Sequence, residues 1–409
     1  MHEYKLTIPR SGVNYYDDSD WKLGGHREKR GTRTGREAVE VTFWKHEDIM
    51  IFVLQLILLV CFALPSWAQG WEKQWNETLA AARKEVKVVV ATSPDPAMRE
   101  ISERFKAHFA ITVEHISGRS GQLATRLRAE RQAGVHTIDV FLGGIQTVAT
   151  VLHREKMLEP LKPALILPEV TNPSKWKTGK VWFVDPEEQH VLRPFSSVTG
   201  LLHLNTRVIK PGEIRSAKDL LNPKWRGKIA TEDPTVAGSG SNTAARLYAQ
   251  LGEEFVKKLY IEQKPVITRE RRQLTDWLAR GTYPIAFAAS SSDVKQMQKE
   301  GFPVVEIYEF PDLPGALSGS PWQLTLMNKA PHPNAARVFV NWMVSKEALE
   351  IYSRSEGRAT IRTDVDESFL PPEVIPRRGV NYFDTFDWEW TVTGKEKIRL
   401  RMKDFLKLP

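Results

Sequence analysis

Residues 219–242 read DLLNPKWRGKIATEDPTVAGSGSN, which contains a turn, a strand and the start of a helix in that order. Asn222-Pro223 ends the turn, because the residue before a proline is disfavoured in the α region. An apolar strand is expected over 229–231, followed by the small-residue loop 233–241 and a helix over 242–251. Such a loop presents backbone N–H groups and a positive helix end to a polar ligand. The pattern equally fits a tight β–α connection that needs glycine only for its turn.

The preceding part of the chain alternates between strands and helices. Apolar runs of strand length occupy 86–92, 111–116 and 138–142, and a helical pattern follows each of them. This alternation predicts βαβ units and a buried parallel sheet, whose ligands bind beyond the carboxyl ends of the strands. Three loops should therefore share one rim, and their candidate ligand-binding residues are Thr92, Ser93, Ser117, Arg119, Ser120, Gly143 and Gly144.

Arg119 is the group that we expect to bind an anionic part of the ligand, since a guanidinium can hold a carboxylate or phosphate through two hydrogen bonds. The alternative is that the glycines of these loops only turn the chain and that Arg119 is a surface charge. Later loops add a second set of candidate ligand-binding residues: Gly238, Ser239, Ser241, Ser290, Ser291 and Trp322. One serine of 290–292 is expected to cap the helix that follows.

With the flanking GLLHLNTRVIKPGEI of 200–214, residues 219–242 resemble the extracellular solute-binding proteins of ABC importers. The most similar group includes the periplasmic ferric-iron-binding proteins, and the resemblance extends more loosely over 86–365. It implies an α/β, two-lobe periplasmic-binding-protein-like type II fold, in which each lobe is a sheet flanked by helices and a cleft lies between the lobes. It also implies a monomer that captures a small solute in the cleft and delivers it to the membrane subunits of an ABC permease.

The expected domain boundaries follow from this resemblance and from the two ends of the chain. We expect an extension over 1–49, a signal peptide over 50–68, the first part of lobe 1 over 69–197, lobe 2 over 198–315, the return to lobe 1 over 316–365, and a helical C-terminal tail that packs on lobe 2 over 366–409.

The N-terminal region carries two signals. Residues 51–63 form an apolar run that is short for a membrane span, and Ser66 and Ala68 have the spacing of a signal-peptidase site. Cleavage after Ala68 would place the mature chain in the periplasm; a retained anchor is the alternative. Residues 9–21 repeat residues 376–388 at nine of thirteen positions. We interpret 1–49 as the end of a related neighbouring gene, with translation starting near Met50, against the alternative of a genuine long leader.

The ferric-binding resemblance implies four iron ligands, and none of them is present here. Their positions fall near Pro94 and Gly144 and at Ser291 and Ser292. We therefore expect no resident metal and no cofactor, and favour a polar or anionic solute such as a phosphonate, a phosphate ester, a carboxylate or chelated iron. A cationic solute such as a polyamine or thiamine is the alternative, for which the loops offer Asp95, Asp233 and Asp293.

Composition excludes several other classes of function. The chain has 409 residues, a net charge of +8 and a single cysteine, so it has no disulfide framework. Its basic residues are dispersed rather than interleaved with aromatics in a stripe, which argues against nucleic-acid binding. Motifs for a nucleophile elbow, a phosphate-binding P-loop or a histidine metal pair are absent from 69–409. We therefore expect no enzymatic activity; a secreted enzyme and a sensor subunit are the less favoured alternatives.

Overall fold

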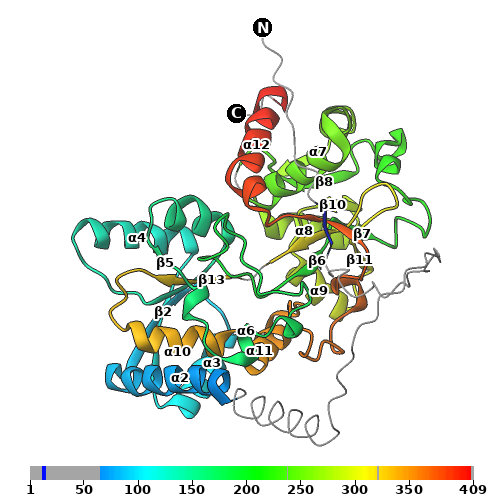
Figure 1. Ribbon diagram of the computed structural model, residues 1–409. Coiled ribbons are helices and arrows are strands. Elements are labelled where there is room, and N and C mark those ends of the chain that lie inside the picture. Colours follow the sequence, from blue (N-terminus) through cyan, green and yellow to red (C-terminus); the bar gives the residue numbers. More distant parts are fainter. Residues whose placement is uncertain (1–11, 15–64, 237, 320–321, 407–409) are drawn as a thin grey trace, which may run out of the picture.

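The computed structural model describes residues 12–14, 65–236, 238–319 and 322–406 (Figure 1). Two five-stranded sheets form the centres of two lobes, and a four-stranded sheet contains the strands through which the chain passes between them. Helices flank both lobe sheets, so the predicted α/β, two-lobe class is confirmed. None of the helices in the described ranges is long and apolar enough to span a membrane.

The sheet of lobe 1 has the strand order β3-β2-β4-β13-β5. The apolar run expected at 86–92 forms its parallel centre, and five of its six strand residues are buried. The return strand β13 is antiparallel to β4, as expected for a chain that re-enters a lobe from the other side. The strands are β2 (Lys87–Thr92), β3 (Thr112–Ser117), β4 (Val140–Gly143), β5 (Leu158–Glu159) and β13 (Gln323–Met327).

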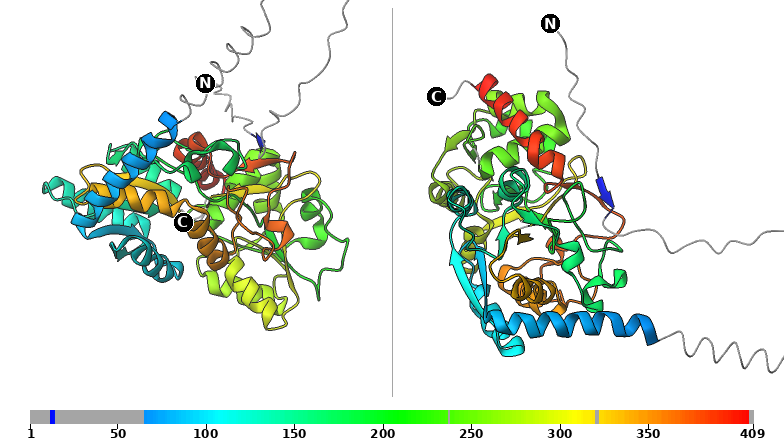
Figure 2. Two further views of the ribbon diagram at one scale, coloured as in Figure 1. Left: turned by 60° about the horizontal axis from the view of Figure 1, so that its bottom comes forward. Right: turned by 60° about the vertical axis from the view of Figure 1, so that its left-hand side comes forward.

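Helices cover both faces of this sheet, and α2 lies along α10 at the outer side of lobe 1, far from α12 (Figures 1 and 2). The expected cleavage site after Ala68 falls inside α2, whereas 50–64 lies outside the described residues. The helices of lobe 1 are α2 (Pro65–Glu85), α3 (Ala97–Phe109), α4 (Ser120–Gln132), α5 (Ile145–Thr147) with its continuation η1 (Val148–His153), η2 (Lys162–Ala164), α6 (Pro168–Thr171), η3 (Pro173–Lys175), α10 (Pro333–Met343) and α11 (Lys346–Glu356).

Lobe 2 has the strand order β11-β7-β10-β8-β9, in which β8, β9 and β10 are parallel and β7 and β11 are antiparallel to their neighbours. The quoted stretch forms the expected turn, strand and helix, although the helix begins three residues earlier than expected, at Ser239. The elements of lobe 2 are β7 (Leu202–Asn205), η4 (Ala217–Leu221), η5 (Pro223–Trp225), β8 (Ile229–Glu232), α7 (Ser239–Lys257) with η6 (Lys258–Glu262), β9 (Val266–Thr268), α8 (Arg271–Arg280), β10 (Ile285–Phe287), α9 (Ser291–Lys299) and β11 (Val304–Ile307).

The chain passes between the lobes through β6 (Ser197–Thr199) and β12 (Ala316–Ser318), which pair antiparallel. The expected lobe boundaries therefore fall within β6 and at the start of β12. The structure differs here from the sequence pattern in two ways. The pattern favours a connection over 196–199 and a strand over 190–195, but 196–199 contains the strand β6, and 190–195 forms only isolated bridges. Pro194 explains the second result, because it has no N–H to donate to a ladder.

The C-terminal tail contacts both lobes. After η7 (Pro372–Val374), strand β14 (Asn381–Asp384) pairs with β12, and β1 (Gly12–Asn14), part of the repeated segment, pairs with β14. η8 (Trp390–Gly394) and α12 (Lys395–Leu406) complete the tail. α12 packs along α7 of lobe 2, while Phe386 and Trp388 pack against the core of lobe 1.

Candidate functional site

The three predicted loops of lobe 1 meet at one edge of its sheet. The N–H of Gly118 donates to the Thr92 carbonyl oxygen at 3.1 Å, and the N–H of Gly144 donates to Ser120 Oγ at 3.3 Å. The loops after β2 and β4 are therefore both hydrogen-bonded to the segment that follows β3. Gly143 must be glycine, because a Cβ atom there would lie 2.0 Å from the Phe141 ring.

These loops carry one cationic side chain that makes no interaction with the described protein. Arg119 has extended backbone angles immediately before α4 and is exposed. It has neither a hydrogen bond nor an ion pair with any residue in the described ranges. Around it, Thr92 is buried, Ser93 is half-buried and Ser117 is exposed. A guanidinium held beside the N-terminus of a helix can bind an oxyanion.

A second group of polar side chains lies in lobe 1 near the end of β2. The Asp95 carboxylate accepts a hydrogen bond from the N–H of Ala97 at 2.8 Å. Burial raises the pKa of Asp95, and the hydrogen bonds from Ala97 and Tyr352 offset this only in part. Burial, together with repulsion from Asp95, raises the pKa of Glu356, and the nearby Arg358 opposes this shift. Two carboxylates thus share a partly buried region with one arginine nearby.

Sequence reasoning named Asp95 only as a possible partner for a cation and missed Tyr352 and Glu356. The two residues are four positions apart on α11, so they lie on the same helix face. Tyr352 is fully buried, with its hydroxyl 2.9 Å from Met98 Sδ. Burial and then the charge of Asp95 raise its pKa well above the usual value. Tyrosine and glutamate at positions i and i+4 are common on amphipathic helices, so no sequence signal distinguished this pair.

Trp322, a predicted ligand-binding residue, lies in the core of lobe 1. Its side chain is 2% exposed and packs edge-on against Phe195 at 5.2 Å and Tyr352 at 5.0 Å between ring centroids. Any influence of Trp322 on a ligand would therefore pass through the position of Tyr352 and its neighbours.

In lobe 2, the polar groups of the loop between β8 and α7 bind one another. Ser241 Oγ donates to the Gly238 carbonyl oxygen at 3.0 Å. Arg271 donates to Glu232 at 2.8 Å and to Ser239 Oγ at 3.1 Å. Glu232 also accepts from the N–H of Gly240 at 3.2 Å, so a carboxylate of the protein already occupies the N-terminus of α7. The predicted anion site of this loop is therefore partly filled by the chain itself.

The remaining predicted residues follow β10. Ser290 Oγ accepts a hydrogen bond from the N–H of Asp293 at 3.3 Å and caps α9, as expected for one serine of this run. Ser291 is the first residue of α9, so its backbone lies at the N-terminus of that helix. Ala288, just before them, has φ of 62°, an uncommon conformation for a residue with a side chain.

Comparison with known proteins supports the fold and the class. The family model for bacterial extracellular solute-binding proteins matches residues 86–357. Iron-bound HitA from Pseudomonas aeruginosa has a TM-score of 0.55 at 16% identity, covering 76% of this chain and 99% of HitA. AfuA from Actinobacillus pleuropneumoniae, solved with fructose-6-phosphate, has a TM-score of 0.54 at 18% identity, covering 79% of this chain and 99% of AfuA. Trichodesmium IdiA (FutA), solved with iron and citrate, has a TM-score of 0.59 at 16% identity, covering 78% of this chain and 98% of IdiA. A search of curated protein sequences gave no match.

The chain therefore belongs to the bacterial extracellular solute-binding protein family. Its fold is that of the two-lobe periplasmic binding proteins, as the resemblance implied. These structural relatives include proteins bound to iron and to a sugar phosphate, so the shared fold does not select the solute.

The raised pKa of Glu356 predicts a pH-dependent effect on stability. An ionised carboxylate with a raised pKa costs stability above that pKa, and this cost disappears below the ordinary pKa, where folded and unfolded chains are both protonated. Glu356→Gln should therefore raise the unfolding temperature at about pH 7, and the gain should vanish near about pH 4. Thermal unfolding of both proteins across this range is the measurement; a gain that persists near about pH 4 would point to packing instead of charge.

Proposed function

We propose that the chain is the periplasmic substrate-binding component of an ABC importer, and that it captures a small polar or anionic solute between its lobes. The observation that carries the proposal is Arg119, which is exposed and has no interaction partner among the described residues, at the point where three linked loops meet at the edge of the lobe 1 sheet. The expected mode of action is a clamp, in which solute bound to one lobe favours the closed form that a permease recognises.

An anionic group is the first choice because Arg119 lies directly before the N-terminus of α4. Phosphonates, phosphate esters and carboxylates all present oxygens that a guanidinium and backbone N–H groups can bind. Two structural relatives were solved with such molecules, fructose-6-phosphate and citrate. Iron would enter this site as a chelate, because the four family ligands for bare iron are replaced at Pro94, Gly144, Ser291 and Ser292.

A cationic solute is the second candidate, and a specific observation favours it. Asp95 and Glu356 both have raised pKa values, and repulsion between the two carboxylates contributes to that of Glu356. An ammonium group placed between them would relieve this repulsion. In lobe 2, by contrast, Asp233 already forms an ion pair with Arg269 at 3.0 Å, so its charge is not available to bind a cationic solute.

A thermal-shift panel on the full chain tests the proposal and separates the two solute classes. The panel contains fructose 6-phosphate, a phosphonate, citrate, ferric citrate, spermidine and thiamine. A solute present at about 100 times its dissociation constant should add about 2.7 kcal/mol, which corresponds to several degrees for a chain of this size. Stabilisation by the anions supports the first choice, and stabilisation by spermidine or thiamine supports the second. Stabilisation by none of them would contradict both.

A further inference from the structure

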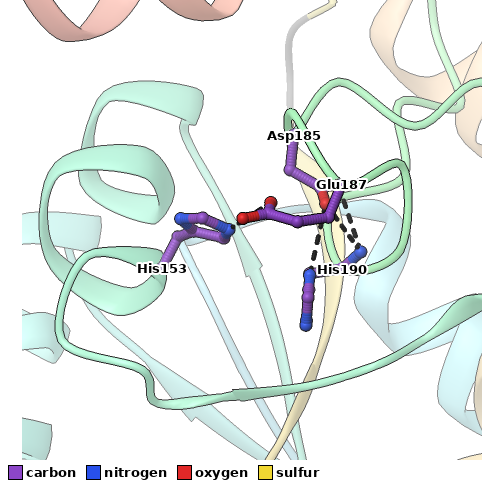
Figure 3. Close-up of side chains that lie close together, drawn as sticks. All are labelled: His153, Asp185, Glu187 and His190. Atoms are coloured by element: carbon purple, nitrogen blue, oxygen red, sulfur yellow. Dashed lines mark hydrogen bonds and ion pairs between the residues drawn. The ribbon is translucent and has the colours of Figure 1, made fainter.

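A cluster of two histidines and two carboxylates lies on lobe 1, away from the loops that carry Arg119. It consists of His153, Asp185, Glu187 and His190, and one potential ligand atom from each side chain lies within 4.8 Å of all the others (Figure 3). His153 is the last residue of η1. The helical segment from Ile145 to His153 separates the cluster from the Gly144 loop by about 12 Å at 1.5 Å per residue.

We propose that these four side chains bind one divalent transition-metal ion of the zinc type. The His153 Nε2 atom lies 3.0 Å from Glu187 Oε2, and the His190 Nδ1 atom lies 3.2 Å from Asp185 Oδ2. Metal–ligand bonds of about 2.0–2.1 Å in a tetrahedron place neighbouring ligand atoms about 3.3 Å apart. These two pairs already have that spacing, and small rotations of the side chains would bring the pairs together.

The loop from Asp185 to Val191 is built to hold its ligands in place. The Asp185 carboxylate accepts hydrogen bonds from the N–H groups of Gln189, His190 and Val191 at 2.8–3.2 Å. Burial alone would raise the pKa of Asp185, but these hydrogen bonds outweigh it and lower the pKa. A metal-ligating carboxylate that is itself hydrogen-bonded is the usual supporting arrangement around a metal site.

The types of ligand atom in the cluster, and the side chains around it, indicate which ion it would bind. Two imidazoles and two carboxylates suit zinc and its neighbours, whereas magnesium and calcium prefer oxygen ligands alone. The two carboxylates would neutralise a divalent cation. Trp388 of the tail packs edge-on against the His153 ring, with 4.8 Å between centroids, and shields one side of the cluster. Glu187 is about half exposed, which leaves an entry path for the ion.

The simpler explanation is two ordinary histidine–carboxylate hydrogen bonds that happen to be neighbours. Another histidine–carboxylate pair of lobe 1 provides a matched control that distinguishes this explanation from a metal site. His108 Nε2 lies 2.9 Å from Glu347 Oε2 and its ring lies 6.4 Å from that of Trp342, but no second histidine is part of that arrangement among the described residues. His108→Ala therefore removes a comparable histidine–glutamate pair without touching the proposed site.

Calorimetric titration of the untagged full chain with Zn²⁺, after treatment with a chelator and dialysis, tests the proposal. We expect one Zn²⁺ per chain and no comparable binding of Mg²⁺ or Ca²⁺. Loss of a group that only supports a metal ligand costs about 10–100-fold in affinity, so the His153→Ala/His190→Ala double variant should lose more than about 100-fold. His108→Ala should bind as tightly as the wild type. Binding should also weaken on acidification, because the ligands must be deprotonated to bind the ion.

Glu187→Gln keeps the test decisive if the double variant does not fold. The Glu187 side chain is about half exposed, and the amide oxygen of glutamine can still accept from His153, so the fold should be unaffected while Zn²⁺ binding weakens at least about tenfold. Absence of stoichiometric Zn²⁺ binding by the wild type would overturn the proposal. So would equal binding by the wild type and the folded His153 and His190 variants, since the ion would then be bound elsewhere.

Discussion

Replacement of Asp384 by alanine is expected to lower the free energy of unfolding by about 3–5 kcal/mol, because it leaves the buried Arg193 without its counter-charge. Arg193 Nη1 donates to both carboxylate oxygens of Asp384, at 2.7 and 2.8 Å. The side chain of Arg193 is fully buried and that of Asp384 is 4% exposed. The guanidinium of Arg193 would therefore lose its charge partner in a region with little access to solvent.

The effect should be large because this ion pair connects the tail to lobe 1. Arg193 also donates to the Phe195 carbonyl oxygen at 3.0 Å and to Ser196 Oγ at 3.2 Å. Its guanidinium lies over the Trp182 ring, 4.2 Å from the centroid, and 5.4 Å from that of Phe386 in the tail. Loss of Asp384 should therefore loosen the β14 region as well as expose an unpaired charge.

Denaturant unfolding of the wild type and Asp384→Ala measures this effect. Glu188→Ala is the matched control, because its partner Lys180 lies 2.8 Å away but both side chains are about half exposed, and such pairs contribute about 0–1 kcal/mol. An Arg193→Met/Asp384→Leu double variant removes both charges and should recover much of the lost stability. If Asp384→Ala unfolds at the same denaturant concentration as Glu188→Ala, the assigned role of the ion pair is wrong.

Arg119→Ala is expected to weaken the binding of an anionic solute at least tenfold, which corresponds to about 1.4 kcal/mol. Arg119 is exposed and makes no interaction with the described residues, so its loss should leave the unfolding temperature of the solute-free protein unchanged. Calorimetric titration with whichever anion stabilises the wild type measures the affinity.

Arg280→Ala provides the control for charge alone. Arg280 is also exposed, but it is the last residue of α8, which leads into the amino end of β10, opposite the edge at which solutes are expected to bind. Arg280→Ala should leave the affinity for the anionic solute unchanged. Equal affinities for wild type and Arg119→Ala would remove Arg119 from the site, whereas weaker spermidine binding by Asp95→Asn would support the cationic alternative.

The lobes could be predicted from the sequence because their local patterns agree with their tertiary environment. β2 and β8 are apolar runs at the centres of sheets, and the turn before β8 is closed by Asn222 and Pro223. That the three loops of lobe 1 share one edge could be predicted because the carboxyl ends of parallel strands lie at the same edge of a sheet. The links between them, such as that from Gly144 to Ser120, could not be foreseen because they depend on how adjacent strands align.

Features that depend on long-range pairing were the ones missed. β6 is a strand because it pairs with β12, more than a hundred residues later, and the sequence SVT alone gives no such signal. The Arg193–Asp384 ion pair joins residues 191 positions apart. Tyr352 and Glu356 fit the pattern of an ordinary amphipathic helix, and only the packing of α11 against α3, which begins just after Asp95, brings them close to Asp95.

Small-angle X-ray scattering of the full chain during titration with a stabilising solute is the most direct test of the two-lobe clamp. We predict that the radius of gyration falls as the solute saturates the wild type, because the lobes close around it. If that solute is anionic, Arg119→Ala at the same solute concentration should stay in the open form. Saturable binding with an unchanged radius of gyration would contradict the account, since the solute would then bind without bringing the lobes together.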